Sequence, residues 1–186
     1  MPSINKMFFS MLCIALFFSS TNQAWPQSIE KQTVLAALTI NIARFTTWPE
    51  LVFKEPESTF NLCIYGDNVV QQSFSNLINN KQVNKRPIHI INISRLRELN
   101  QCQLIYISEL ERNKLIPLLL ELKDKPILTI GENSEFLKAG GLVGLENIKG
   151  KIQLTINLAI IKQSKLIISS RLLKLATIVN YPIPNN

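Results

Sequence analysis

The residue types that most often carry catalysis or bind metals are scarce in this sequence. His89 is the only histidine among 186 residues, and it lies between isoleucines with no Asp or Glu close to it. A metal site built from His and Cys needs three or four ligands, and the histidine and the cysteines do not cluster along the chain. The acidic residues form no recognisable carboxylate pair for acid/base chemistry. The sequence therefore predicts a protein without a catalytic site, a metal or a cofactor.

Two similar turns follow predicted strands and place an acidic side chain next to a glycine. These turns are Gly66-Asp67 and Gly131-Glu132. In a parallel sheet both lie at the carboxyl edge, where open α/β sheets usually bind ligands. They therefore indicate either a ligand-binding edge or plain turns. The glycine-rich run 140–144 lacks the Lys-Ser/Thr of a phosphate loop and precedes a strand, so we interpret it as a tight turn.

A cation and two large aromatic side chains occur together in the run RFTTWP, residues 44–49. Trp and Arg are residue types that dominate the energetics of protein interfaces. The run is therefore either a helix end packed on the sheet or a docking surface. Arg171 stands out near the other end of the chain, because no metal, nucleophile or phosphate chemistry needs it there. We predict a partner- or ligand-binding surface that contains Arg44, Phe45, Trp48, Ser170, Arg171 and Leu172.

The first residues are typical of a secretory signal. Lys6 is followed by an apolar stretch at 7–18 and by small and polar residues at 19–24. The apolar stretch is too short to span a bilayer comfortably. We therefore predict a cleavable signal peptide at 1–24 and a single exported domain at 25–186. A retained membrane anchor is the alternative.

Two cysteines remain in the exported chain, Cys63 and Cys102, because Cys13 belongs to the predicted signal. An exported protein meets an oxidising compartment, in which such pairs form disulfides. Cys63 lies inside a predicted strand and Cys102 just before another, so neighbouring strands can bring them together. We predict a disulfide between them, with two buried free thiols as the alternative.

The chain is moderately basic. It carries 20 Lys and Arg against 13 Asp and Glu, and loss of Lys6 with the signal leaves a net charge of about +6. The cations are scattered without a run of five, so nucleic-acid binding is not expected. A mildly basic surface favours an acidic partner or an anionic membrane face.

Alternating strands and helices must position these residues. Period-two alternation and continuous apolar runs predict strands at 60–65, 88–93, 104–107, 127–131, 142–145 and 151–158. Spacings of three and four predict helices at 27–47, after Asp67, at 109–122, at 133–138 and at 170–179. This order predicts an α/β three-layer sandwich: a mostly parallel sheet of about six strands, flanked by helices, with a C-terminal antiparallel hairpin.

Several details of these elements are specific enough to test. Asp67 or Asn68, Ser108, and Ser169 or Ser170 are placed to cap helix starts. Residues 165–168 form either a short strand or a connector. The last helix is expected to bury one stripe of apolar side chains, made of Leu172, Leu175, Ala176 and Val179.

These elements together resemble the YfiR family of exported regulatory proteins. Each matching stretch is short, but they occur in the family's order over nearly all of the exported chain. The stretches are ALTINIARFTTWP (37–49), LCIYG (62–66), CQLIYIS (102–108), ILTIG (127–131), FLKAGG (136–141) and residues 150–176.

The resemblance implies a non-enzymatic periplasmic repressor. Such a protein binds the periplasmic sensing domain of an inner-membrane diguanylate cyclase and thereby lowers cyclic-di-GMP signalling and biofilm formation. The resemblance also implies a tendency to form homodimers and sensitivity to the redox state of cysteines. Cys63 and Cys102 fit one of the family's cysteine pairs, whereas a second pair towards the C-terminal hairpin is missing here. The alternative is a small-ligand-binding domain that serves a membrane sensor kinase or transporter.

Overall fold

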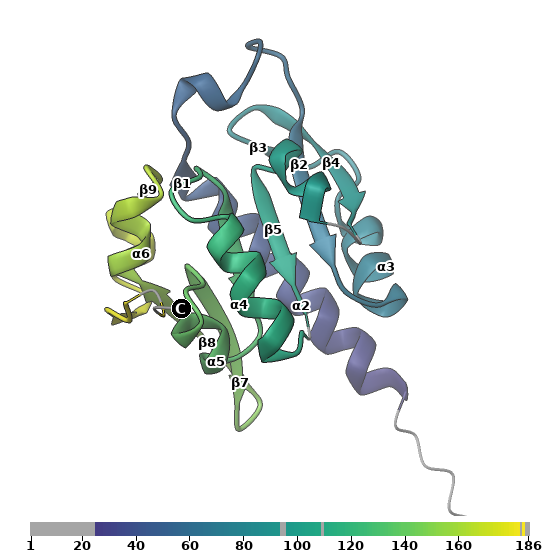
Figure 1. Cartoon of the computed structure of the whole chain (residues 1–186). Coiled ribbons are helices and arrows are strands. Elements are labelled where there is room, and N and C mark those ends of the chain that lie inside the picture. The colour runs from purple at the N-terminus through teal and green to yellow at the C-terminus, as the bar shows by residue number, and fades with distance from the viewer. Residues whose placement is uncertain (1–24, 94–95, 109, 183, 185–186) are drawn as a thin grey trace, which may run out of the picture.

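The computed structural model describes residues 25–93, 96–108, 110–182 and 184. The predicted signal peptide lies outside the described residues. No helix among those described is both long and apolar enough to span a bilayer. The fold is α/β, with one large sheet between helices on its two faces (Figure 1).

An eight-stranded sheet forms the middle layer. Its strands are β2 (Phe60–Tyr65), β3 (Gln82–Val83), β4 (Arg86–Asn92), β5 (Leu104–Ile107), β6 (Leu128–Gly131), β7 (Val143–Ile148), β8 (Lys151–Asn157) and β10 (Thr177–Val179). Their order is β10-β8-β7-β6-β5-β2-β4-β3. The pairs are parallel except β7 with β8, the predicted hairpin, and β3 with β4. All six predicted strands are present, and β3 and β10 extend the sheet at its two edges.

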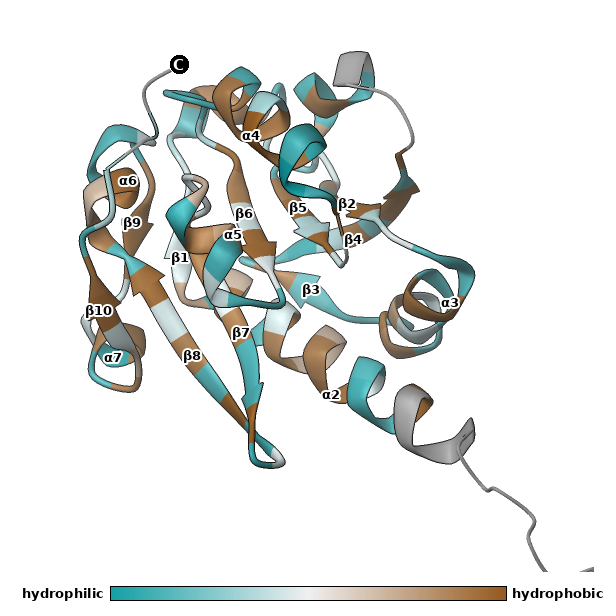
Figure 2. Ribbon diagram, turned by 60° about the horizontal axis from the view of Figure 1, so that its bottom comes forward, coloured by the Kyte–Doolittle hydropathy of each residue, from teal (hydrophilic) through white to brown (hydrophobic). Residues whose placement is uncertain are grey.

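Helices cover both faces of this sheet. They are α2 (Trp25–Arg44), α3 (Asn68–Leu77), α4 (Arg112–Glu121), α5 (Ser134–Lys138), α6 (Leu158–Gln163) and α7 (Ser170–Leu173), with 3-10 helices η1 (Glu50–Val52) and η2 (Leu96–Gln101). Side chains alternate between the faces along each strand. Leu104 and Tyr106 of β5 join a core with α2, α3 and α6, whereas Ile105 and Ile107 join a second core with η2, α4 and α5. Figure 2 shows how hydrophobic β5 and β6 are, as expected of strands that are covered on both faces.

A separate two-stranded ribbon joins segments from opposite ends of the chain. β1 (Thr46–Thr47) pairs antiparallel with β9 (Ile167–Ile168), so that Thr47 lies opposite Ile167. The predicted helix 27–47 is therefore too long at its C-terminal end, because two β-branched threonines leave the helix to pair with β9. The segment 165–168 contains a short strand, one of its two predicted alternatives.

The predicted helix at 170–179 is wrong over its second half. Ser169 caps the start as predicted, since its hydroxyl oxygen accepts a hydrogen bond from the Arg171 N–H at 3.3 Å, but α7 has only four residues. The β-branched residues of β10 pair with β8 instead and satisfy polar backbone groups along its edge. Leu175, expected in the buried stripe, is 76% exposed.

Candidate functional site

The structure joins Cys63 and Cys102 in a disulfide, as predicted, and not as two free thiols. Cys63 lies in β2, and Cys102 comes shortly before the neighbouring strand β5, with 5.8 Å between the two Cα atoms. Both residues are buried in the core beneath η2 and α4. The bond therefore ties β2 to the start of β5.

The two halves of the predicted docking surface meet across the β1–β9 ribbon. The backbone N–H of Ser169 donates to the backbone oxygen of Phe45 at 2.8 Å. The segment around Phe45 thus lies beside the segment that leads into α7, although the two come from opposite ends of the chain. We define the β1–β9 surface by the exposed residues Phe45, Thr47, Ile167, Ser170 and Arg171.

Exposure divides the six predicted docking residues into two groups. Phe45, Ser170 and Arg171 are exposed on the β1–β9 surface. Arg44 is also exposed, and its Nε atom donates to the backbone oxygen of Gln82 in β3 at 3.0 Å, which holds it at the border of that surface. The other two, Trp48 and Leu172, are buried in the core and do not belong to the exposed surface.

Trp48 is buried because it connects the end of the β1 segment to the sheet. Its indole Nε1 donates to the backbone oxygen of Gln103 at 3.0 Å. Its ring packs edge-on against Phe60, with 4.9 Å between the ring centroids. Of the two interpretations of the aromatic run, packing on the sheet therefore holds for Trp48.

The structure also exposes apolar side chains that the sequence analysis did not single out. Ile167 is 68% exposed on the β1–β9 surface, and Leu51 in η1 is 99% exposed. Periodicity could not reveal them, because an apolar residue in a strand or turn normally points into a core. One signal was available: residues 147–186 contain six Lys and Arg but no Asp or Glu. An exposed apolar patch with polar or charged residues around it marks a binding surface.

A shallow hollow of about 450 Å³ lies close to this surface. Its apolar walls come from Pro49, Leu51 and Ile127, and its cationic walls come from Lys125 and Lys165. Lys165 lies two positions before Ile167, so the hollow continues the basic and apolar character of the β1–β9 surface.

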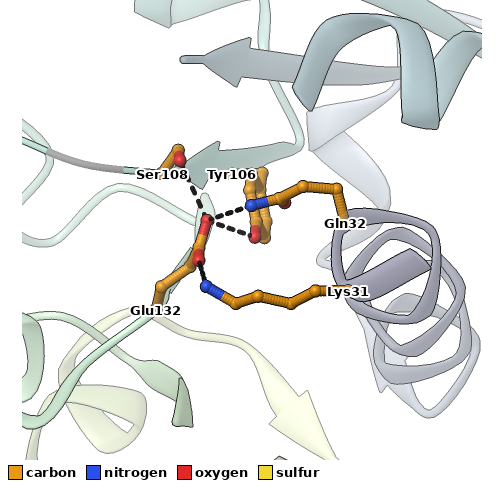
Figure 3. A network of polar contacts seen from close by, with 5 residues as sticks. All are labelled: Lys31, Gln32, Tyr106, Ser108 and Glu132. Carbon is orange, nitrogen blue, oxygen red and sulfur yellow. Dashed lines mark hydrogen bonds and ion pairs between the residues drawn. The ribbon is translucent and has the colours of Figure 1, made fainter. Parts of the chain in front are cut away.

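The second candidate site is a buried carboxylate at the carboxyl edge of the sheet. Glu132 follows β6, and its side chain is 7% exposed. Its Oε1 accepts hydrogen bonds from the Tyr106 and Ser108 hydroxyls, both at 2.9 Å, and from the Gln32 amide at 3.5 Å. Its Oε2 forms an ion pair with Lys31 Nζ at 2.9 Å. Figure 3 shows how α2 supplies the amide and the ammonium group from one side.

These contacts decide the protonation states in this buried cluster. Burial alone would raise the pKa of Glu132, but its hydrogen bonds and the charge of Lys31 outweigh burial, so the pKa is lowered. Burial, together with the adjacent carboxylate, raises the pKa of Tyr106. Glu132 is therefore charged at neutral pH, and the Tyr106 hydroxyl acts as a hydrogen-bond donor.

The Glu132→Gln substitution is expected to destabilise the protein in a pH-dependent way. At about pH 7 it should lower the free energy of unfolding by about 1–2 kcal/mol, a range reduced for the partial exposure of Lys31. The pKa is below its ordinary value of 4.5 in the folded state, so the carboxylate stabilises the fold above that pH. This contribution is lost as the pH falls through the lowered pKa. Urea titrations of both proteins at about pH 7 and about pH 3 should show the difference shrinking, and a pH-independent difference would contradict it.

The other predicted features of this edge are the two capping residues, of which one has a local partner and one does not. Asp67 caps α3, since its side chain accepts the Val70 N–H at 3.0 Å. The predicted capping role of Ser108 is wrong, because α4 begins only at Arg112 and the Ser108 hydroxyl binds Glu132 instead. At this edge the interpretation as a plain turn therefore fits Asp67, whereas Glu132 is the centre of a network that local sequence could not reveal.

Fold and site together define a three-layer α/β protein with a buried disulfide and an exposed β1–β9 ribbon. The model of the YfiR/HmsC-like family matches residues 32–177, from α2 to the first residue of β10, and the chain belongs to that family. This family is not a known enzyme family. A search of curated proteins finds no match.

Proposed function

We propose that this protein is a periplasmic regulator that restrains a membrane signalling partner, and that the partner is a diguanylate cyclase. Membership of the YfiR/HmsC-like family supports this class of function. The disulfide supports an oxidising compartment such as the periplasm. On this proposal the protein lowers cyclic-di-GMP signalling and biofilm formation by binding its partner, without catalysis of its own.

The observation that carries the binding role is the exposure of Phe45 and Ile167 on the β1–β9 surface, 38% and 68% respectively. Burying apolar area against a partner stabilises a complex by about 25 cal/mol per Å², before the costs of association. The exposed cations Arg171 and Lys165 add positive charge near these side chains. The surface therefore suits an apolar patch with acidic neighbours on the partner's periplasmic domain.

Substitutions on this surface should separate binding from stability. Ile167→Ser and Arg171→Ala should each leave the free energy of unfolding within about 0.5 kcal/mol, because both side chains are exposed. Together they should weaken binding to the partner by about tenfold or more. Affinity capture from membranes with the double variant, and cellular cyclic-di-GMP, measure the two effects.

A matched control lies on the β7–β8 hairpin. Ile148 is 43% exposed and lies opposite the exposed Lys151, so Ile148→Ser with Lys151→Ala removes one apolar and one cationic group elsewhere on the sheet. This control should bind normally. The proposal fails if wild-type protein captures neither a cyclase nor a sensor kinase and if its deletion leaves cyclic-di-GMP unchanged.

A second candidate function is the binding of a small ligand on behalf of a membrane sensor kinase or transporter. The hollow beside Leu51 favours it, since that hollow combines apolar walls with two lysines. A ligand that raises the unfolding temperature of the wild-type protein but not of the Lys165→Met variant would support this role.

A further inference from the structure

The first turns of α2 contact the body of the protein in an unusual way. Among residues 29–34, only Lys31 and Gln32 are partly buried, and the other four are exposed. Both partly buried side chains bind Glu132. From Leu35 onward, by contrast, α2 contributes fully buried residues to the core. The start of the helix is therefore held by polar contacts to one carboxylate, and the rest by apolar packing.

The position of the first turns of α2 agrees with their lack of apolar packing. In Figures 1 and 2 the first turns extend past the sheet and the other helices. Ile29 and Val34 on these turns are 54% and 44% exposed. Little apolar area would be uncovered if these turns moved, so the contacts with Glu132 are the main interactions that keep them in place.

On the sheet side, hydrogen bonds hold Glu132 in place. On the helix side, one buried polar atom has no hydrogen-bond partner among the described residues. Two hydroxyls orient Glu132: that of the buried Tyr106 in β5 and that of the partly buried Ser108 just after this strand. On the helix side, the Oε1 atom of Gln32 is buried and finds no hydrogen-bond donor among the described residues. A buried acceptor without a donor destabilises the closed arrangement. Lys31 is 39% exposed, so solvent reaches the same site.

We propose that Glu132, Tyr106 and Ser108 form a binding site for a primary ammonium group, which Lys31 occupies in cis. The first turns of α2 then act as a latch over the carboxyl edge, the place where α/β sheets bind ligands. The latch opens when another cationic group takes the place of Lys31, and opening frees residues 29–34. This inference does not depend on which partner the β1–β9 surface binds.

Hydrogen exchange of the full exported chain tests the latch. In Lys31→Met and in Glu132→Gln, amides of residues 29–34 should exchange about tenfold faster than in the wild type, because the same contact is lost. The double variant should exchange no faster than either single variant. In Lys31→Met, amides of residues 38–44 should keep their protection, since that part of α2 is packed in the core.

Two controls distinguish the latch from general destabilisation. Lys31→Arg keeps the charge and should keep the protection. Glu135→Gln with Lys138→Met removes a neighbouring, solvent-exposed ion pair of 2.7 Å and should leave residues 29–34 unchanged. Unchanged exchange of residues 29–34 in either variant would overturn the proposal, and so would an equal increase throughout α2, β5 and β6 in Lys31→Met, which would make the ion pair a stabiliser of the whole fold.

The chemistry of the site can be probed directly with small amines. In the wild type, ethylammonium chloride should speed the exchange of residues 29–34, because it can donate hydrogen bonds to Glu132 and take the place of Lys31. Tetramethylammonium chloride at the same concentration should not, since it carries the charge without a donor. Equal effects of the two salts, or the same acceleration by ethylammonium in the Glu132→Gln variant, would refute the ammonium site.

Discussion

Replacing Cys63 and Cys102 together by alanine is expected to lower the free energy of unfolding by about 4 kcal/mol. The bond closes a loop between residues 39 positions apart, and the chain-entropy model assigns about this stabilisation to such a loop. Alanine avoids placing a hydroxyl in a site where both residues are almost fully buried. Urea unfolding measures the change as a lower midpoint, with a steeper dependence on urea because the unfolded chain becomes less compact.

Reduction of the wild-type protein provides the matched control. Reduction removes the same covalent bond without replacing either cysteine. The free energy of unfolding of the reduced protein should therefore fall nearly to that of the double variant. A difference of less than about 1 kcal/mol between oxidised and reduced wild type would contradict this result and leave the disulfide without a stabilising role. A disulfide that stabilises the fold strongly also makes the stability of the protein depend on an oxidising compartment.

Trp48→Ala is expected to lower the free energy of unfolding by about 3–5 kcal/mol, the usual cost of removing a buried aromatic side chain. The substitution deletes the edge-on contact with Phe60 and the hydrogen bond to the backbone of Gln103. Trp48→Phe keeps much of the ring contact and should cost less, although the indole hydrogen bond, worth about 1 kcal/mol, is still lost. Chemical denaturation followed by circular dichroism measures both.

Phe45→Ala is the comparison for Trp48, because both aromatic residues come from the same run and only Phe45 is exposed. Its stability should change by less than about 1 kcal/mol, whereas partner binding should weaken. If Trp48→Ala left stability intact and weakened partner binding, the result would support the binding role predicted for Trp48.

Features that depend on neighbours in the chain were predictable. Period-two alternation and continuous apolar runs identified all six predicted strands, because a strand covered by helices must place apolar side chains on one or both faces. Asp67 and Ser169 were recognised as caps, since a cap needs only its own side chain and an N–H two or three residues away. The disulfide was also predictable, because only two cysteines lie outside the predicted signal peptide.

Features that depend on distant partners were missed. Residues 170–179 fit a helical stripe, yet the last three of them add a strand to the edge of β8. Ser108 has the chemistry of a cap but lies within reach of Glu132. In both cases local propensity allowed two structures, and contacts from elsewhere in the chain selected one.

By itself the sequence determined the α/β class, the YfiR-family resemblance and the residues of the disulfide. Only the tertiary structure decided which members of the predicted docking surface face solvent, and it buried Trp48 while exposing Ile167. It alone brought Lys31 to Glu132 across 101 positions of sequence. The reason is physical: alternation and capping are local, whereas burial and ion pairing depend on which distant segments the fold places side by side.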